Sequence, residues 1–134
     1  MELQGRVAIV TGGGRGIGRA IAQELGEAGA FVLVGYSQSE GPAQEVASQI
    51  GGQAVKADVS TAEGCDALVA AAEAKGSLDI LVNNAGITRD GLMLRMPDED
   101  WHAVLETNLG GVFRLCRSAA AVMLQQRSGA IVNV

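Results

Sequence analysis

The sequence predicts an α/β fold in which a parallel β-sheet is covered by helices on both faces. Apolar residues make up 48% of the 134 residues and aromatic residues only 3%, so Val, Ile, Leu and Ala must build the core. Short apolar runs rich in β-branched residues alternate with longer amphipathic segments. Because the connections are short and crossovers between parallel strands are right-handed, this alternation favours a parallel sheet with helices on both sides.

Five strands and four helices are predicted in strict alternation. The predicted strands are residues 6–11, 31–36, 53–59, 78–86 (including the loop that leaves the strand) and 130–134. The predicted helices are residues 16–29, 42–50, 60–76 and 97–127. The run at 6–11 is continuously apolar and stops at glycines, as expected for a strand buried on both faces, and the short β-branched run at 130–134 also predicts a buried strand. The chain shows no linker, repeat or low-complexity tract, so we expect one domain over residues 1–134.

Three helix starts carry recognisable signals. Pro42 can occupy the first turn of its helix, where a missing N–H costs nothing. Ser60 and Glu63 have the spacing of a capping box. Three acidic residues open the long helix, where the positive end of the helix dipole favours negative charge: Asp98, Glu99 and Asp100.

A glycine-rich loop, TGGGRGIG at residues 11–18, lies directly between the first strand and the first helix. Gly12 permits a sharp turn, Gly16 lets the backbone approach a phosphate, and Gly18 lets the helix pack close to the strand. The unpaired N–H groups of the helix N-terminus suit a pyrophosphate. The alternative is a glycine-rich turn without a ligand. A P-loop is excluded, because no Gly-Lys-Ser/Thr follows.

The TGxxxGxG spacing of this loop resembles that of the short-chain dehydrogenases/reductases. NNAG at residues 83–86 matches the second signature of that family, and Asp58-Val59 matches the position that touches the adenine. The stretch NNAGITRDGLMLRM followed by W...ETNL is similar to one subgroup, the 3-oxoacyl-[acyl-carrier-protein] reductases of fatty acid synthesis. The resemblance implies a Rossmann-like three-layer sandwich with strand order 3-2-1-4-5, truncated before the later strands of such enzymes.

The cofactor expected from this resemblance is NADP(H). An NAD site usually has Asp or Glu at the end of the second strand, but this chain has Ser37 there and no acid before Glu40. Arg15 can reach the same corner with a charge-assisted contact, and Ser37 can donate its hydroxyl. Alternatively, Arg15 is a solvated surface charge. The expected cofactor-binding residues are Gly12, Gly14, Arg15, Gly16, Ile17, Gly18, Ser37, Asp58, Val59, Asn84, Ala85 and Gly86.

The expected catalytic residue is Asn108, which falls on an apolar helical stripe with Leu105 and Val112. By resemblance it matches the helix asparagine that holds a water and links it to a catalytic lysine; alternatively, it is a buried amide bonded to nearby backbone. The family also uses a serine and Tyr-x-x-x-Lys. The only tyrosine, Tyr36, has no lysine four residues on. We therefore expect the catalytic C-terminal part to be absent and the isolated chain to be inactive.

The resemblance implies that the whole enzyme, of which this chain would be the N-terminal part, catalyses NADPH-dependent reduction of a 3-oxoacyl thioester, linked to acyl carrier protein, to the 3-hydroxyacyl form. The alternatives are a non-catalytic NADP-binding half-domain and a short-chain reductase of another ketone or alcohol. A methyltransferase with a similar glycine loop is disfavoured, because that fold expects an acid after the second strand and does not use NNAG. We expect a cytoplasmic protein, or one of an organelle with bacterial-type fatty acid synthesis.

Composition limits the partners. The net charge of −5 argues against nucleic acid, and no apolar run reaches the roughly 18 residues of a membrane span. One histidine and two separated cysteines make a metal site improbable. The helix over 98–127 has apolar residues on more than one face. By resemblance, the whole enzyme is therefore expected to be a homotetramer in which this helix forms the subunit contact. Arg127 is a weaker candidate for contact with an acidic carrier protein.

Overall fold

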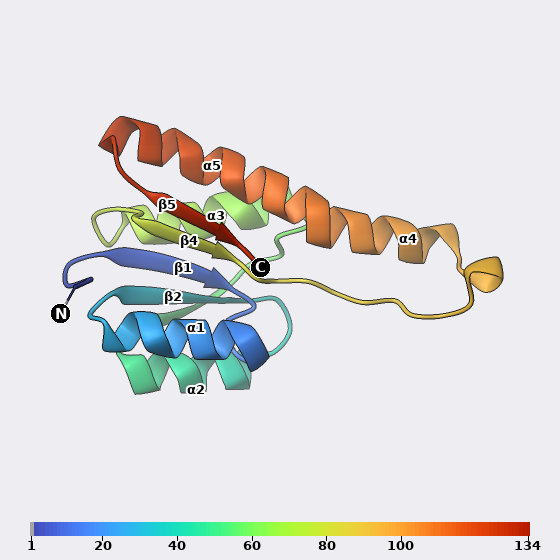
Figure 1. The fold of residues 1–134 in the computed structure, drawn as a ribbon, viewed down its shortest axis with the longest axis horizontal. Coiled ribbons are helices and arrows are strands. Elements are labelled where there is room, and N and C mark those ends of the chain that lie inside the picture. Colours follow the sequence, from blue (N-terminus) through green and yellow to red (C-terminus); the bar gives the residue numbers. More distant parts are fainter. Residues whose placement is uncertain (1) are drawn as a thin grey trace.

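The computed structural model describes residues 2–134 and has a five-stranded sheet between two layers of helices (Figure 1). The strands are β1 (Val7–Thr11), β2 (Phe31–Tyr36), β3 (Gln53–Lys56), β4 (Ile80–Asn83) and β5 (Ala130–Asn133). All pairings are parallel, and the strand order is β3-β2-β1-β4-β5. The predicted fold class and strand order are therefore confirmed.

Helices cover both faces of this sheet. The helical elements are α1 (Gly16–Glu27), α2 (Glu40–Ile50), α3 (Ala62–Glu73), η1 (Met93–Arg95), α4 (Asp98–Leu105), η2 (Glu106–Gly110) and α5 (Gly111–Gln126). Figure 1 shows α1 and α2 on one side of the sheet and α3 and α5 on the other. None of the helices within residues 2–134 has the length and apolar character that crossing a bilayer requires.

Successive side chains of β1, β2 and β4 enter two separate cores. Ile9, Leu33 and Leu81 pack in the core shared with α3 and α5. Their neighbours Val10 and Val34 pack in the core shared with α1 and α2. This division follows from the two-residue period of a strand, since side chains point alternately to the two faces. It explains why β1 and β2 are nearly unbroken apolar runs. The expectation that residues 130–134 form a buried strand is wrong, because β5 lies at the edge of the sheet and is exposed at all four residues.

The predicted helix over 97–127 is not one continuous α-helix. It consists of α4, a π-helical turn η2 and α5. α5 packs against α3 and β4, and buries Leu115, Ala119 and Met123. α4 instead projects beyond the sheet with η1 (Figure 1), and it has no buried residue. The second half of the predicted helix therefore packs on the core, whereas the first half does not.

The capping box predicted at Ser60 and Glu63 is wrong. The N-cap of α3 is Thr61, whose hydroxyl accepts a hydrogen bond from the Gly64 N–H at 3.0 Å. Because the helix starts one residue later, Glu63 is not at the third helical position that a capping box requires. Pro42 lies in the first turn of α2 as predicted, but that helix begins two residues earlier.

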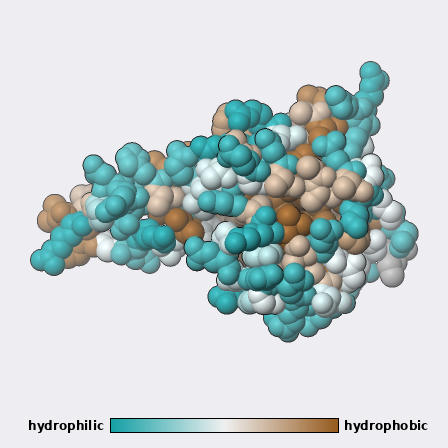
Figure 2. Space-filling model, turned by 180° about the vertical axis from the view of Figure 1, so that it is seen from behind, coloured by the Kyte–Doolittle hydropathy of each residue, from teal (hydrophilic) through white to brown (hydrophobic). Residues whose placement is uncertain are grey.

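The projecting arm and the outer face of the helices expose apolar side chains. Leu92, Met93 and Leu94 are 70%, 84% and 94% exposed. Figure 2 shows apolar side chains gathered at the tip of this arm. A second exposed row runs along α4, η2 and α5: Trp101, Leu105, Leu109 and Phe113. The predicted excess of apolar surface on this helical segment is therefore present.

Candidate functional site

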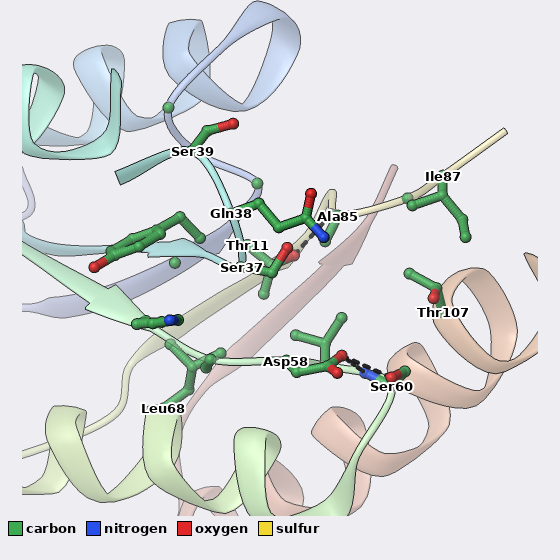
Figure 3. Close-up of a pocket in the computed structure, with 18 of the residues that line it drawn as sticks. Thr11, Ser37, Gln38, Ser39, Asp58, Ser60, Leu68, Ala85, Ile87 and Thr107 are labelled. Atoms are coloured by element: carbon green, nitrogen blue, oxygen red, sulfur yellow. Dashed lines mark hydrogen bonds between the residues drawn. The ribbon is translucent and has the colours of Figure 1, made fainter. Parts of the chain in front are cut away.

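A cavity of about 770 Å³ opens at the carboxyl ends of the strands. Its walls come from the loops after β1, β2, β3 and β4 and from residues 103–107 of the helical segment. Figure 3 shows Ser37, Asp58 and Thr107 arriving from three different elements. β1 lies between β2 and β4, so the chain leaves neighbouring strands toward opposite faces of the sheet. Such a switch point is where open α/β sheets bind ligands.

The glycine loop forms the floor of this cavity. Gly12 has a φ of +59°, a conformation that glycine adopts at little cost. A Cβ on Gly18 would lie 2.2 Å from the Gly12 carbonyl oxygen, so only glycine allows α1 to start this close to β1. Arg15 is the N-cap of α1, and its side chain makes no capping hydrogen bond. The first N–H groups of α1 therefore have no side-chain cap from that residue.

Thr11 ties the exit of β1 to the exit of β4. Its buried hydroxyl oxygen accepts hydrogen bonds from the backbone N–H groups of Asn84 and Ala85, both at 2.9 Å. The Asn84 amide donates in return to the carbonyl oxygens of Thr11 and Gly12, both at 3.2 Å. These bonds hold the NNAG turn against the glycine loop. Asn84 therefore lies behind the loop, with its amide group engaged in this support.

Asp58 forms part of the opposite wall and is held by Ser60. The carboxylate accepts hydrogen bonds from the Ser60 hydroxyl at 2.6 Å and from the Ser60 N–H at 2.9 Å (Figure 3). Both bonds favour the ionised carboxylate and hold the pKa of Asp58 below its ordinary value. The side chain is exposed, so its second oxygen remains available to a ligand in the cavity.

Asn108 lies in the π-helical turn and pairs with one residue of the loop after β4. Its Oδ1 accepts from the Ile87 N–H at 2.8 Å, and its Nδ2 donates to the Ile87 carbonyl at 2.9 Å. The expectation that Asn108 is buried is wrong, since the residue is exposed. One lone pair on its oxygen and one N–H of its amide remain free for further bonds. Single π-helical turns within α-helices, such as this one, are frequent at functional sites.

The structure brings together most of the predicted cofactor-binding residues. Those on the cavity wall are Gly12, Gly14, Arg15, Ser37, Asp58, Val59, Ala85 and Gly86. Those behind or beside it are Gly16, Ile17, Gly18 and Asn84. Asn108 is not on the wall either, but its neighbours Glu106 and Thr107 are. No cluster of potential metal ligands is present among residues 2–134.

Sequence reasoning missed several wall residues. Thr11 had a signal, since it opens the glycine motif at the end of β1. Tyr36, Gln38 and Ser39 could have been predicted from their position at the end of β2, because that strand ends at the same edge of the sheet as β1. Lys56 had a weaker signal, its position two residues before Asp58. Ile87, Arg89 and Ala103 had none, because their contact with the cavity depends on the path of the projecting arm.

Comparison with known proteins identifies the family. The family model described as short chain dehydrogenase matches residues 6–134. The chain belongs to the short-chain dehydrogenase family. The glycine loop, the NNAG turn and the strand order described above are thus features of a short-chain dehydrogenase.

Three curated relatives with the same name are similar to the chain. The chain is 45% identical to 3-oxoacyl-[acyl-carrier-protein] reductase FabG of Vibrio cholerae over all of its own length and 56% of the relative's. It is 46% identical to the Staphylococcus aureus protein of that name over 95% of its length and 54% of the relative's. The Escherichia coli protein is 42% identical, with 100% and 56% covered. The chain thus spans about half the length of these relatives.

A solved structure of a short-chain dehydrogenase has a similar fold. It is the Burkholderia cenocepacia protein, described as a complex with NADP. The TM-score is 0.88 and the sequence identity 39%, over 99% of this chain and 56% of the other. The fold of the described residues is therefore that of the corresponding part of this short-chain dehydrogenase.

Proposed function

We propose that the cavity binds NADP(H), with the pyrophosphate over the glycine loop and the adenine beside Asp58 and Val59. The observation that carries this proposal is the geometry of the loop. Gly16 has a φ of +54°, and, apart from its two chain neighbours and the backbone of its own helix, no atom of the described chain lies within 4 Å of a Cβ added to it. The space in front of the first turn of α1 is therefore open to a phosphate, which the free N–H groups and the helix dipole attract. The NADP complex of the Burkholderia cenocepacia relative supports the same cofactor.

The preference for NADP(H) over NAD(H) rests on charge at the end of β2. Ser37, Gln38 and Ser39 line the cavity there, and none of them is an acid that would repel a 2′-phosphate. Arg15 lines the same cavity and forms no salt bridge with any residue of the described chain. Its guanidinium is thus free for a phosphate.

Fluorescence titration of the 134-residue chain with NADPH and NADH tests this preference. We expect NADPH to bind at least about tenfold more tightly, the scale of one charge-assisted contact. Arg15→Glu should weaken NADPH far more than NADH, because the carboxylate repels the 2′-phosphate. Tighter binding of NADH by the unaltered chain would contradict the proposal.

For the whole protein we propose reduction of a 3-oxoacyl thioester, carried by acyl carrier protein, to the 3-hydroxyacyl form. The names of three relatives at 42–46% identity support this substrate class. NADPH, when bound, supplies a hydride to the carbonyl carbon. Asn108 has one lone pair and one N–H left beyond its bonds to Ile87, and these suit it to hold a water near the reacting groups. We place the reaction in the cytoplasm or in an organelle with bacterial-type fatty acid synthesis.

The 134 residues themselves contain no Tyr-x-x-x-Lys, and thus no proton donor of the family's kind. This favours a second candidate function for the chain on its own, NADP binding without turnover. When the chain is mixed with NADPH and an acetoacetyl thioester, we expect the absorbance of the reduced nicotinamide to stay constant. Turnover at an enzyme-like rate would overturn this expectation. Activity of the whole protein on another ketone but not on the thioester would redirect the substrate class.

Assembly of the whole protein is proposed to use the exposed apolar row Trp101, Leu105, Leu109 and Phe113. These side chains are 37–65% exposed in the single chain and lie outside the core that α5 shares with α3. Pairing with the same row of a second copy would remove them from water. Sedimentation of the whole protein should show a homotetramer, and Leu109→Glu should dissociate it. An unaltered sedimentation coefficient for this variant would exclude the row as the interface.

A further inference from the structure

Lys56 is the last residue of β3 and lies beside the end of β2. In the strand register Lys56 is opposite Tyr36, and the next N–H, of Ala57, donates to the Tyr36 carbonyl at 2.8 Å. Tyr36 directly precedes Ser37, so Lys56 lies next to the segment where the ribose of the cofactor is proposed to bind. Lys56 is exposed, and it lines the same cavity as Ser37 and Arg15.

The side chain of Lys56 belongs to the same face of the sheet as the glycine loop. Val55 and Ala57, its neighbours in the chain, pack in the core of α3 and α5. Ala54, two residues earlier, packs in the core of α1 and α2. Because side chains alternate along a strand, Lys56 points to the α1 and α2 side. Arg15, the N-cap of α1, lies on that side too.

The charge of Lys56 has no partner within the described chain. The ion pairs of residues 2–134 join Arg6 to Asp79, Arg19 to Glu45 and Arg114 to Glu106, and none involves Lys56. The nearest carboxylate along the strand, Asp58, is bonded to Ser60 instead. Arg15 and Lys56 therefore line one cavity without an ion-pair partner, as does Arg89, which comes from the loop after β4 and not from the α1 and α2 side.

We propose that Lys56 is a specificity-determining residue that binds the 2′-phosphate of NADP(H) together with Arg15. The inference rests on the proposed binding of NADP(H) and adds a second cation to that site. A phosphate monoester carries about −1.5 to −2 charges at neutral pH, so one guanidinium leaves part of its charge unbalanced. A lysine ammonium on a flexible four-carbon stem is a mobile point charge that can follow such a group. β3 is an edge strand, where a lysine also discourages pairing with other chains, but that role predicts no effect on a nucleotide.

Calorimetric titration of the 134-residue chain with 2′,5′-ADP and 5′-AMP tests the proposal, since these probes differ only in the 2′-phosphate. Lys56→Gln should weaken 2′,5′-ADP about fivefold, the scale of one partly exposed charged hydrogen bond, and change 5′-AMP by less than about twofold. Lys56→Arg should keep the affinity for 2′,5′-ADP within about twofold. The matched control is Lys75→Gln, which removes the only other lysine, held over the Phe31 ring at the opposite end of β2. It should change neither affinity.

The outcomes separate this inference from the proposed function. If Lys56→Gln leaves 2′,5′-ADP unchanged, or weakens both probes equally, while Arg15→Gln removes the preference, the role of Lys56 is overturned and NADP(H) binding stands. If the unaltered chain does not distinguish the two probes, the choice of NADP(H) fails and the inference fails with it. Equal thermal midpoints of the variants by circular dichroism establish that each is folded.

Discussion

Before and after β4, a side-chain amide pairs with both backbone groups of one residue, but the two pairs have different surroundings. At the amino end, the Gln126 side chain accepts from the Leu78 N–H at 3.0 Å and donates to the Leu78 carbonyl at 2.8 Å. At the carboxyl end, Asn108 makes the same pair of bonds to Ile87, at 2.8 and 2.9 Å. In each case one amide satisfies both backbone groups of a residue that the sheet leaves unpaired. These bonds join the helical segment 98–126 to the chain at two points, before β4 at Leu78 and after β4 at Ile87.

The surroundings of the two amide pairs differ. Leu78 is fully buried, and the Gln126 pair lies where α5 packs in the core of α3 and α5. The Asn108 pair is exposed and stands beside the cavity, in a π-helical turn with no buried residue. The buried Gln126 pair therefore contributes to stability. The exposed Asn108 pair keeps polar atoms accessible beside the cavity, so removing one amide pair or the other should have separable effects.

Replacement of Thr11 is expected to have the largest effect, because it affects both stability and the site. Thr11→Val keeps the shape but leaves the N–H groups of Asn84 and Ala85 without their acceptor. At about 1–1.5 kcal/mol for each half-buried donor, the free energy of unfolding should fall by roughly 2–3 kcal/mol. Chemical denaturation measures it. NADPH affinity should also fall, since the glycine loop loses its link to NNAG.

The control for this change is Thr11→Ser, which retains the hydroxyl and should lose less than half as much stability. If Thr11→Val bound NADPH as tightly as the unaltered chain, the carboxyl end of β4 would not be coupled to the site.

Gln126→Ala comes next and should affect stability alone. It removes the partner of both backbone groups of buried Leu78, at a cost of about 1–2 kcal/mol in the free energy of unfolding. The neighbouring Gln125 is exposed and makes no side-chain hydrogen bond within the described chain, so Gln125→Ala should cost less than about 0.5 kcal/mol. Both variants should bind NADPH like the unaltered chain. A loss of binding in Gln126→Ala would show that the two ends are coupled.

Asp79 gives the amino end a dependence on pH. Burial alone would raise the pKa of Asp79, but hydrogen bonds from the Ser77 hydroxyl and the Val7 N–H, together with the charge of Arg6, hold it below its ordinary value. The folded state therefore binds protons less readily than the unfolded chain. The stabilisation is complete above the unfolded pKa of about 4 and is lost as the pH falls through the folded pKa.

Asp79→Asn tests this dependence. At pH 7 the variant should be less stable by about 1 kcal/mol, since an amide oxygen is a weaker acceptor than a carboxylate. The difference from the unaltered chain should shrink as the pH is lowered from 5 to 2, where the carboxylate becomes protonated. The free energy of unfolding of both chains across this range provides the measurement. A difference that is constant with pH would assign the stabilisation to shape and not to charge.

The sequence predicts the parallel sheet because strand periodicity and the glycine motif are local signals, whereas the strand order is expected only from the resemblance to the short-chain dehydrogenases/reductases. Ile9 and Val10 enter opposite cores, as an unbroken apolar strand requires. The position of the glycine loop follows from the same reasoning, since it lies directly between a strand and a helix. These signals need only neighbouring residues, which explains why they succeed.

Other features depend on contacts between distant segments, and the sequence alone does not predict them. The π-turn at Glu106–Gly110 has no propensity signal that separates it from an α-helix, and its Asn108 is bonded to a residue 21 positions away. Ser60 is a good N-cap by type, but its hydroxyl binds Asp58 and Thr61 caps α3 instead. The role of Lys56 in the cavity depends on its register with Tyr36 in another strand.

Asn108→Ala is expected to have the smallest effect on stability and a local effect on the carboxyl end. The pair with Ile87 is exposed, so water replaces the lost partner and the free energy of unfolding should fall by less than about 1 kcal/mol. Hydrogen exchange of the Ile87 N–H should nevertheless become about fivefold faster, because its acceptor is gone. Asn108→Asp keeps the acceptor and loses only the donor, so exchange at Ile87 should stay slow in that variant. If Asn108→Ala cost as much stability as Gln126→Ala, burial would not distinguish the two amide pairs, and the Asn108 pair would have to be regarded as part of the structural framework.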